Sequence, residues 1–141
     1  MSVPTFADIV AGHQPVHKVA EDSEHLAWLA ERPARPGHVI VATRRVVDGV
    51  FDLDADAHAA LWAFAREVGR ALRERLPCQR VCVSVIGWVV RHAHIHLVPT
   101  DAPGQVPGLD GPPLPAAAMA AMAARLREGG ISVRGSRDGC H

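Results

Sequence analysis

Histidine and apolar residues alternate strictly between positions 92 and 97, which is the most regular pattern in the chain. Successive side chains of a β-strand point to opposite faces, so His92, His94 and His96 are predicted to project from one face. The apolar residues between them are predicted to face a core. A half-buried strand usually carries mixed polar residues on its solvent side. Three imidazoles therefore indicate a bound anion, a proton transfer or a metal.

The remaining elements follow from apolar periodicity and from turn residues. Four further strands are predicted at residues 16–20, 24–30, 38–42 and 81–86, and the last of them is expected to form an antiparallel hairpin with the histidine strand. Apolar residues recur at steps of three and four from Ala55 to Leu76, which predicts a long amphipathic helix ended by Pro77. Shorter helices are predicted at residues 5–12, capped by Thr5, and at residues 116–128. The predicted class is α+β: an antiparallel five-stranded sheet with one long helix and short flanking helices.

Proline and glycine divide the chain into segments. Residues 32–37 are predicted to form a rigid loop that leads into the strand beginning at His38. Residues 101–115 are rich in proline and glycine, which predicts an arm without regular structure, and residues 131–141 are expected to fray. We therefore expect one main domain over residues 1–105, followed over residues 106–141 by the arm, a helix and a tail.

The composition narrows the class of partner. The chain has 141 residues, of which 48% are hydrophobic and 21% charged, as in an ordinary globular protein. Fifteen basic residues balance fifteen acidic ones, so no net charge attracts nucleic acid or a membrane surface. The three cysteines, Cys78, Cys82 and Cys140, have neither metal-site nor disulfide-framework spacing. No signal-like or membrane-length apolar run occurs, so we expect a cytoplasmic protein without nucleic-acid or membrane partners.

The central histidine of the three is the best candidate for a nucleophile. A neutral imidazole attacks phosphorus well when its far nitrogen is hydrogen-bonded, and flanking imidazoles can bind phosphate oxygens or protonate a leaving group. This assigns attack to His94 and assistance to His92 and His96. Metal binding is the competing chemistry, but no second cluster of Cys, Asp or Glu lies close in sequence. Cys140-His141 is interpreted as part of a frayed terminus, and His13, His17 and His25 as surface residues.

Residues 92–98, His-Ala-His-Ile-His-Leu-Val, resemble the signature of the histidine triad (HIT) family, in which histidines and apolar residues alternate. Residues 6–12 look like the family's opening helix, Pro36-Gly37-His38 like its turn into a strand, and residues 51–53 precede the long helix as expected. The resemblance covers roughly residues 4–100.

The resemblance implies a HIT-like fold and an activity. It implies a nucleotidyl hydrolase or transferase that acts at the α-phosphate of a nucleoside phosphate derivative, such as a phosphoramidate or a dinucleoside polyphosphate, without a cofactor. His94 matches the covalent nucleophile, His92 and His96 its partners, and His38 a fourth active-site histidine. The expected substrate-binding residues are Phe6, Ile9, Trp88 and Val89. The resemblance also implies a homodimer whose sheets and long helices pack together.

Several positions depart from the family's pattern. Pro4, Ala7 and Val46 stand where many relatives bind structural zinc, so we expect no metal. Ala30 replaces an acidic residue that commonly holds the ribose hydroxyls, and Trp88-Val89 replaces a polar pair that binds phosphate oxygens. Loss of such contacts, each about 1–3 kcal/mol when buried, leaves open a nucleotide-binding or interaction protein with little or no turnover.

The tryptophans give two further expectations. Trp62 lies off the apolar stripe of the long helix, so it is predicted to contact another element or a partner subunit. Trp88 lies close to the triad and is interpreted as a core residue, with a place beside the substrate as the alternative.

Overall fold

The computed structural model describes residues 5–105 and 112–130. Their elements are the helices α1 (Phe6–Val10), α2 (Ala55–Arg75) and α3 (Ala116–Arg127), the short 3₁₀ helix η1 (Val50–Asp52), and the strands β1 (Lys18–Glu21), β2 (His25–Leu29), β3 (Val39–Thr43), β4 (Arg80–Ser84) and β5 (His94–Thr100). The strands form one five-stranded antiparallel sheet in the order β1-β2-β3-β5-β4. The predicted α+β class and the antiparallel five-stranded sheet are confirmed.

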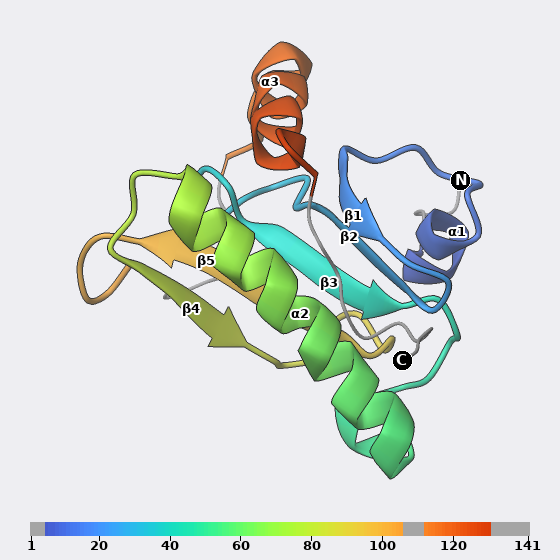
Figure 1. The fold of residues 1–141 in the computed structure, drawn as a ribbon. Coiled ribbons are helices and arrows are strands. Elements are labelled where there is room, and N and C mark those ends of the chain that lie inside the picture. Colours follow the sequence, from blue (N-terminus) through green and yellow to red (C-terminus); the bar gives the residue numbers. More distant parts are fainter. Residues whose placement is uncertain (1–4, 106–111, 131–141) are drawn as a thin grey trace.

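The long helix covers one face of the sheet (Figure 1). Its predicted apolar stripe is buried and packs on the inward-facing residues of the strands; the stripe consists of Leu61, Phe64, Val68, Leu72 and Leu76. Asp54 caps the first turn by accepting a hydrogen bond from the Ala57 amide at 2.8 Å. The helix therefore lies where its amphipathic pattern requires.

The opposite face of the sheet carries α1 and the histidines. A capping box starts α1, because the Thr5 hydroxyl accepts from the Asp8 amide while the Asp8 carboxylate accepts from the Thr5 amide, both at 3.1 Å. A small apolar cluster joins α1 to this face and includes Val10, Trp28 and Ile40. The short helix thereby reaches over β2 and β3 toward the site.

The C-terminal helix belongs to the core on the side of α2. Met119, Ala123 and Leu126 of α3 are buried in the same cluster as the stripe of α2. The guanidinium of Arg75, at the end of α2, donates to the carbonyls of Leu126 and Gly130 and so caps the end of α3. The division at residue 105 remains a prediction, and residues 131–141, with the predicted tail and Cys140-His141, lie outside the described residues.

Three local expectations are corrected. Strand β4 pairs with β5 as the predicted antiparallel hairpin, but it ends at Ser84 rather than at residue 86, and nine residues rather than a short connection join it to β5. The histidine strand begins at His94, with His92 just before it. His25 is wrong as a surface residue: it is 3% exposed, its Nδ1 bonds the Asp22 carboxylate at 2.9 Å, and its ring stacks on Phe64. No helix in residues 5–105 and 112–130 has the length and apolar character needed to cross a membrane.

Candidate active site

The histidines of the predicted site come together where β3 and β5 lie side by side. Strand β5 pairs with β3 so that His94 lies opposite Ala42 and His96 opposite Ile40. The rings of His94 and His96 lie 4.9 Å apart between centroids, and those of His38 and His96 lie 5.1 Å apart. The Pro36-Gly37 turn delivers His38 into this group from the residue before β3.

The orientation of His94 follows from one hydrogen bond. Its Nδ1 lies 2.6 Å from the carbonyl oxygen of His92, and a carbonyl only accepts, so Nδ1 carries the proton. The electron pair of the neutral ring therefore resides on Nε2. Burial is the main cause that lowers the pKa of His94 below its usual value, which keeps this electron pair available near neutral pH.

A chain of hydrogen bonds sets the protons on His38 and His96. The amide of Ala34 donates to His38 Nδ1 at 3.0 Å, so the proton of the neutral His38 ring is on Nε2. His38 Nε2 then donates to His96 Nδ1 at 2.9 Å, which leaves the proton of the neutral His96 ring on its Nε2. Burial lowers the pKa of both rings to about 4. His96 is thus a neutral hydrogen-bond donor at physiological pH.

His92 is held from the other side. Its Nε2 donates to the carbonyl oxygen of Thr43 at 2.6 Å. Its Nδ1 is the one buried side-chain nitrogen or oxygen without a hydrogen-bond partner in the described part of the chain. Leaving such an atom without a partner costs about 1–3 kcal/mol, and a catalytic role is one explanation for the cost.

A hollow of ≈ 460 Å³ lies beside the histidines, and we call it the triad hollow. A row of neighbouring residues across three strands connects the hollow to the histidines, since Trp28 lies opposite Ile40 and Ile40 lies opposite His96. The ring of Phe6 meets those of Trp28 and His94 edge-on, each at 5.0 Å. The residues that line the triad hollow include Phe6, Ile9, Trp28 and Ile40, with Gln14, His17 and Glu31 as polar members and Pro113, Leu114, Ala116 and Met119 from the C-terminal segment.

The predicted substrate-binding residues separate into two groups. Phe6 and Ile9 line the triad hollow, whereas Trp88 and Val89 are 83% and 94% exposed on the connection between β4 and β5. The interpretation of Trp88 as a core residue is therefore wrong, because that connection stands off the sheet. Ala30 is buried, but its neighbour Glu31 lines the triad hollow and gives it a carboxylate.

Sequence reasoning missed Trp28, Ile40 and the C-terminal segment as members of the site. The first two could have been found, because the period-two pattern of β2 and β3 places them on the histidine face. No local signal marks Pro113 or Leu114.

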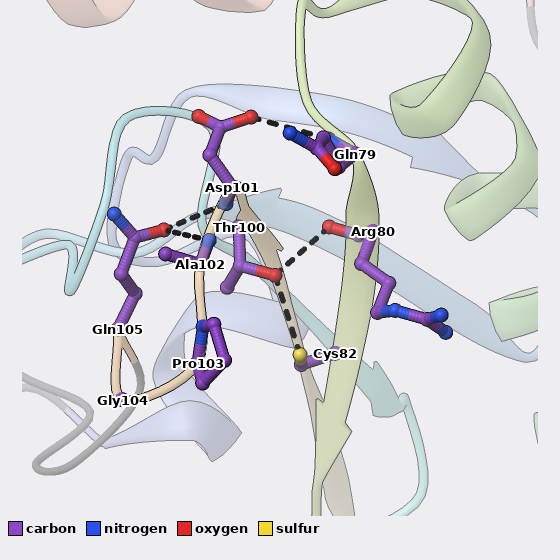
Figure 2. Close-up of a pocket in the computed structure, with 9 residues that line it drawn as sticks. All are labelled: Gln79, Arg80, Cys82, Thr100, Asp101, Ala102, Pro103, Gly104 and Gln105. Carbon is purple, nitrogen blue, oxygen red and sulfur yellow. Dashed lines mark hydrogen bonds between the residues drawn. The ribbon is translucent and has the colours of Figure 1, made fainter.

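Other hollows lie away from the histidines. Figure 2 shows one of ≈ 380 Å³ at the far end of β4 and β5, where the Thr100 hydroxyl donates to the Arg80 carbonyl at 3.2 Å and lies 3.4 Å from Cys82 Sγ. Thr100 is four residues beyond His96, about 13 Å along the strand. A third hollow of ≈ 400 Å³ lies between α2 and β4 and includes Trp62, Val81 and Val83. Trp62 packs against the core and donates to His58 Nε2 of its own helix at 3.2 Å. Its contact with another element or a partner subunit stays a prediction.

The described residues contain no group of three or more His, Cys, Asp or Glu side chains placed to hold a metal ion.

Comparisons with known proteins bear on the family and the fold of the chain. A HIT domain profile matches residues 11–102. The chain is 30% identical over 73 residues to a bis(5'-adenosyl)-triphosphatase of Dictyostelium discoideum and 36% identical over 73 residues to a bifunctional bis(5'-adenosyl)-triphosphatase/adenylylsulfatase of Arabidopsis thaliana. These alignments cover 48% of this chain in both cases, and 49% and 41% of the respective relatives, so the chain spans about half the length of these relatives or less. An uncharacterised HIT-like protein of Saccharolobus solfataricus is 28% identical over 67% of this chain and 72% of its own length.

Solved structures show the same fold. A hypothetical histidine triad nucleotide-binding protein of Sulfolobus tokodaii superposes with a TM-score of 0.79 at 20% identity, covering 87% of this chain and 89% of its own. A zinc-bound histidine triad family protein of Mycobacterium smegmatis gives 0.71 at 25% identity, covering 87% and 92%. The profile match spans more than half of the sequence and includes all four histidines of the site, so the chain belongs to the HIT family.

Proposed function

We propose that the protein is a nucleotidyl hydrolase or transferase that acts at the α-phosphate of a nucleoside phosphate derivative, through a covalent intermediate on His94. The observation that carries the proposal is the 2.6 Å hydrogen bond from His94 Nδ1 to the His92 carbonyl. It fixes the tautomer whose Nε2 electron pair can attack phosphorus. The names of the two triphosphatase relatives support the substrate class.

In the first step His94 Nε2 forms a bond to phosphorus while the bond from phosphorus to the leaving group breaks. The leaving amine or phosphate departs with the bonding electron pair and takes a proton from His92 Nδ1, the nitrogen that has no partner within the described residues. In this proposal His92 enters the step as the imidazolium, with one proton on Nε2 toward the Thr43 carbonyl and the other on Nδ1, and it is neutral until the second step. His96 Nε2–H donates a hydrogen bond to a non-bridging phosphate oxygen as charge develops there.

In the second step water attacks the nucleotidyl-histidine. His92 Nδ1 takes the proton of the water, the bond between phosphorus and His94 breaks, and its electron pair returns to Nε2. The product is a nucleoside monophosphate, and the site returns to its starting protonation. An alcohol in place of water would make the same step a transfer.

Turnover of adenosine 5'-phosphoramidate tests this proposal. We expect release of AMP by the unaltered protein and a loss of at least about 10³-fold in kcat for His94→Ala. His13→Ala, which removes an exposed imidazole outside the site, is the matched control and should keep full activity. Binding of AMP without turnover by the unaltered protein would contradict the enzyme. It would favour the binding or interaction protein that the apolar Trp88-Val89 pair suggests.

The proposal includes a homodimer built through β4 and α2. Strand β4 lies at the edge of the sheet, where unpaired backbone groups favour pairing with another strand, and its residue Val83 is 51% exposed. We expect the protein to sediment as a dimer and Val83→Asp, which places a charge in the interface, to sediment as a monomer. Val46→Asp, an exposed position off this edge, is the control; equal behaviour of both variants would contradict this interface.

A cytoplasmic location also remains a prediction. It is consistent with Cys78 and Cys82, which are free thiols in the described chain.

A further inference from the structure

The triad hollow is completed by a segment remote in sequence from the histidines. Pro113, Leu114, Ala116 and Met119 line it together with Phe6 and Ile9 of α1. The residues of this segment lie more than fifteen positions beyond the triad and outside the matched HIT domain, which ends at residue 102. The hollow is therefore lined by Trp28 and Ile40 of the matched domain and by two segments outside it, α1 and residues 113–119.

The C-terminal side of the hollow is held firmly in place. Met119 is buried both in the core and against the hollow, and Leu126 of the same helix is fully buried. Two arginines fasten the end of α3: Arg75 donates to the Gly130 carbonyl at 2.6 Å, and Arg127 donates to the Lys18 carbonyl at 2.7 Å. These contacts fix α3 to the end of α2 and to β1, and Leu114 directly precedes this helix.

Among the residues of the C-terminal segment that line the hollow, Leu114 is the one whose exposed surface a ligand would cover. It lies just before the first turn of α3 and is 38% exposed, although it lines the hollow. Phe6, Trp28 and Ile40 also line the hollow, so a flat group bound there would have apolar side chains from α1, the sheet and the C-terminal segment around it. Gln14, His17 and Glu31 supply hydrogen-bonding groups at this hollow. Apolar surfaces with a few polar groups are the usual lining of a small-molecule site.

We propose that Leu114 and Met119, contributed by the same chain as the triad, form the specificity-determining side of the substrate site. They limit the size of the heteroaromatic base in the nucleotide whose α-phosphate reacts. The inference rests on the proposed function, because it assigns the base of the substrate to the triad hollow. On this inference the base lies in the hollow that Phe6 and Leu114 both line, so a larger side chain at position 114 should leave room for only a smaller ring.

Three substitutions at Leu114 test this role by steady-state kinetics with adenosine and cytidine 5'-phosphoramidates. Leu114→Ala removes contact with the base, and KM for the adenosine substrate should rise roughly tenfold at nearly constant kcat. Leu114→Trp fills the hollow and should raise KM for the adenosine substrate at least tenfold more than for the cytidine substrate. Leu114→Met conserves the side-chain volume, so KM and kcat should stay close to those of the unaltered protein. Val46→Ala, at an exposed apolar position outside the hollow, should change neither constant.

The outcomes separate this inference from the proposed function. Lack of turnover of either substrate by the unaltered protein would overturn the proposed function. Normal turnover together with an unchanged ratio of the two KM values in both Leu114→Ala and Leu114→Trp would overturn the role of Leu114. A parallel loss of kcat and of thermal stability in all three variants would assign Leu114 a structural role and would also overturn the inference.

Discussion

The protons of the active site are assigned by two backbone groups. The Ala34 amide and the His92 carbonyl each bond one imidazole, and their fixed donor or acceptor character determines the tautomers of His38, His96 and His94 in turn. The three rings therefore differ in role although they are the same residue type. His94 presents an electron pair, and His96 presents a proton.

Replacing His38 tests this arrangement at the residue scale. His38→Phe removes the donor to His96 Nδ1, so the His96 proton is no longer confined to Nε2, and kcat should fall roughly 10–100-fold. That is the loss seen when the hydrogen-bond partner of a metal-bound histidine is removed. The KM should change little, because His38 does not line the triad hollow.

His38→Gln distinguishes positioning from simple packing. The glutamine amide can donate to His96 Nδ1, and this variant should recover part of the lost kcat. Equal activity of the two variants, or a rise in KM that accounts for the whole effect, would contradict a positioning role for His38.

At the scale of elements, the pairing of β3 with β5 is what converts a sequence motif into a site. The alternation of residues 92–97 predicts that three imidazoles share a face, and the structure brings His38 to them from the turn before β3. Gly37 makes this turn with φ +89°, a conformation that favours glycine. An added Cβ would also lie 2.5 Å from Leu76 Cδ1 and 3.1 Å from Pro99 Cγ.

Gly37→Ala is therefore expected to destabilise the fold. The positive φ and the contact with Leu76 together should lower the free energy of unfolding by about 2–3 kcal/mol, measured by urea denaturation. Gly12→Ala, where φ is also positive but no atom lies within 4 Å of the added Cβ, is the matched control and should cost about 1 kcal/mol. A cost for Gly37→Ala no greater than that of the control would show that close packing at the turn is unimportant.

The positions of helices and strands were easier to predict from the sequence than the burial of individual side chains. The stripe of α2 and the Thr5 cap have strong local signals, and both lie as predicted. The burial of His25 depends on Asp22 and on Phe64, which is 39 residues away in sequence, so it has no local signal. The exposure of Trp88 likewise depends on how a nine-residue connection leaves the sheet.

Within the site, the sequence motif identified the reacting groups but not the whole cavity. His94 and His96 could be placed because strand geometry alone puts them together. Leu114 could not, because its position results from the packing of α3 on the end of α2 and on β1. The resemblance places an acidic residue at position 30, which is Ala30 in this chain, but the carboxylate that lines the triad hollow belongs to Glu31. This shift by one position depends on the path of the chain beyond β2.

For the whole molecule, the buried imidazoles couple folding to pH. Burial lowers the pKa of His38 and His96 to about 4, against about 6.5 for histidine in an unfolded chain. Between pH 6.5 and 4 the unfolded chain therefore binds more protons than the native protein. The stability that these rings contribute is complete above about pH 7 and is lost as the pH falls through this range.

Urea denaturation at pH 7 and pH 5 measures this coupling. The fully buried His38 should account for about 2 kcal/mol of lost stability at pH 5, and the partly exposed His96 for less. The loss between pH 7 and pH 5 should accordingly be smaller in His38→Gln than in the unaltered protein. Identical losses in the two proteins would contradict the neutral, buried state of His38.

The proposed mechanism requires that His94 carry the nucleotidyl group during turnover. Rapid mixing with adenosine 5'-phosphoramidate, an alkaline quench that preserves the phosphorus–nitrogen bond, and mass spectrometry of the peptides test this directly. We expect one adenylyl adduct, on His94, that is absent from His94→Ala and still formed by His13→Ala. Turnover with no adduct, or an adduct on any other residue, would contradict it.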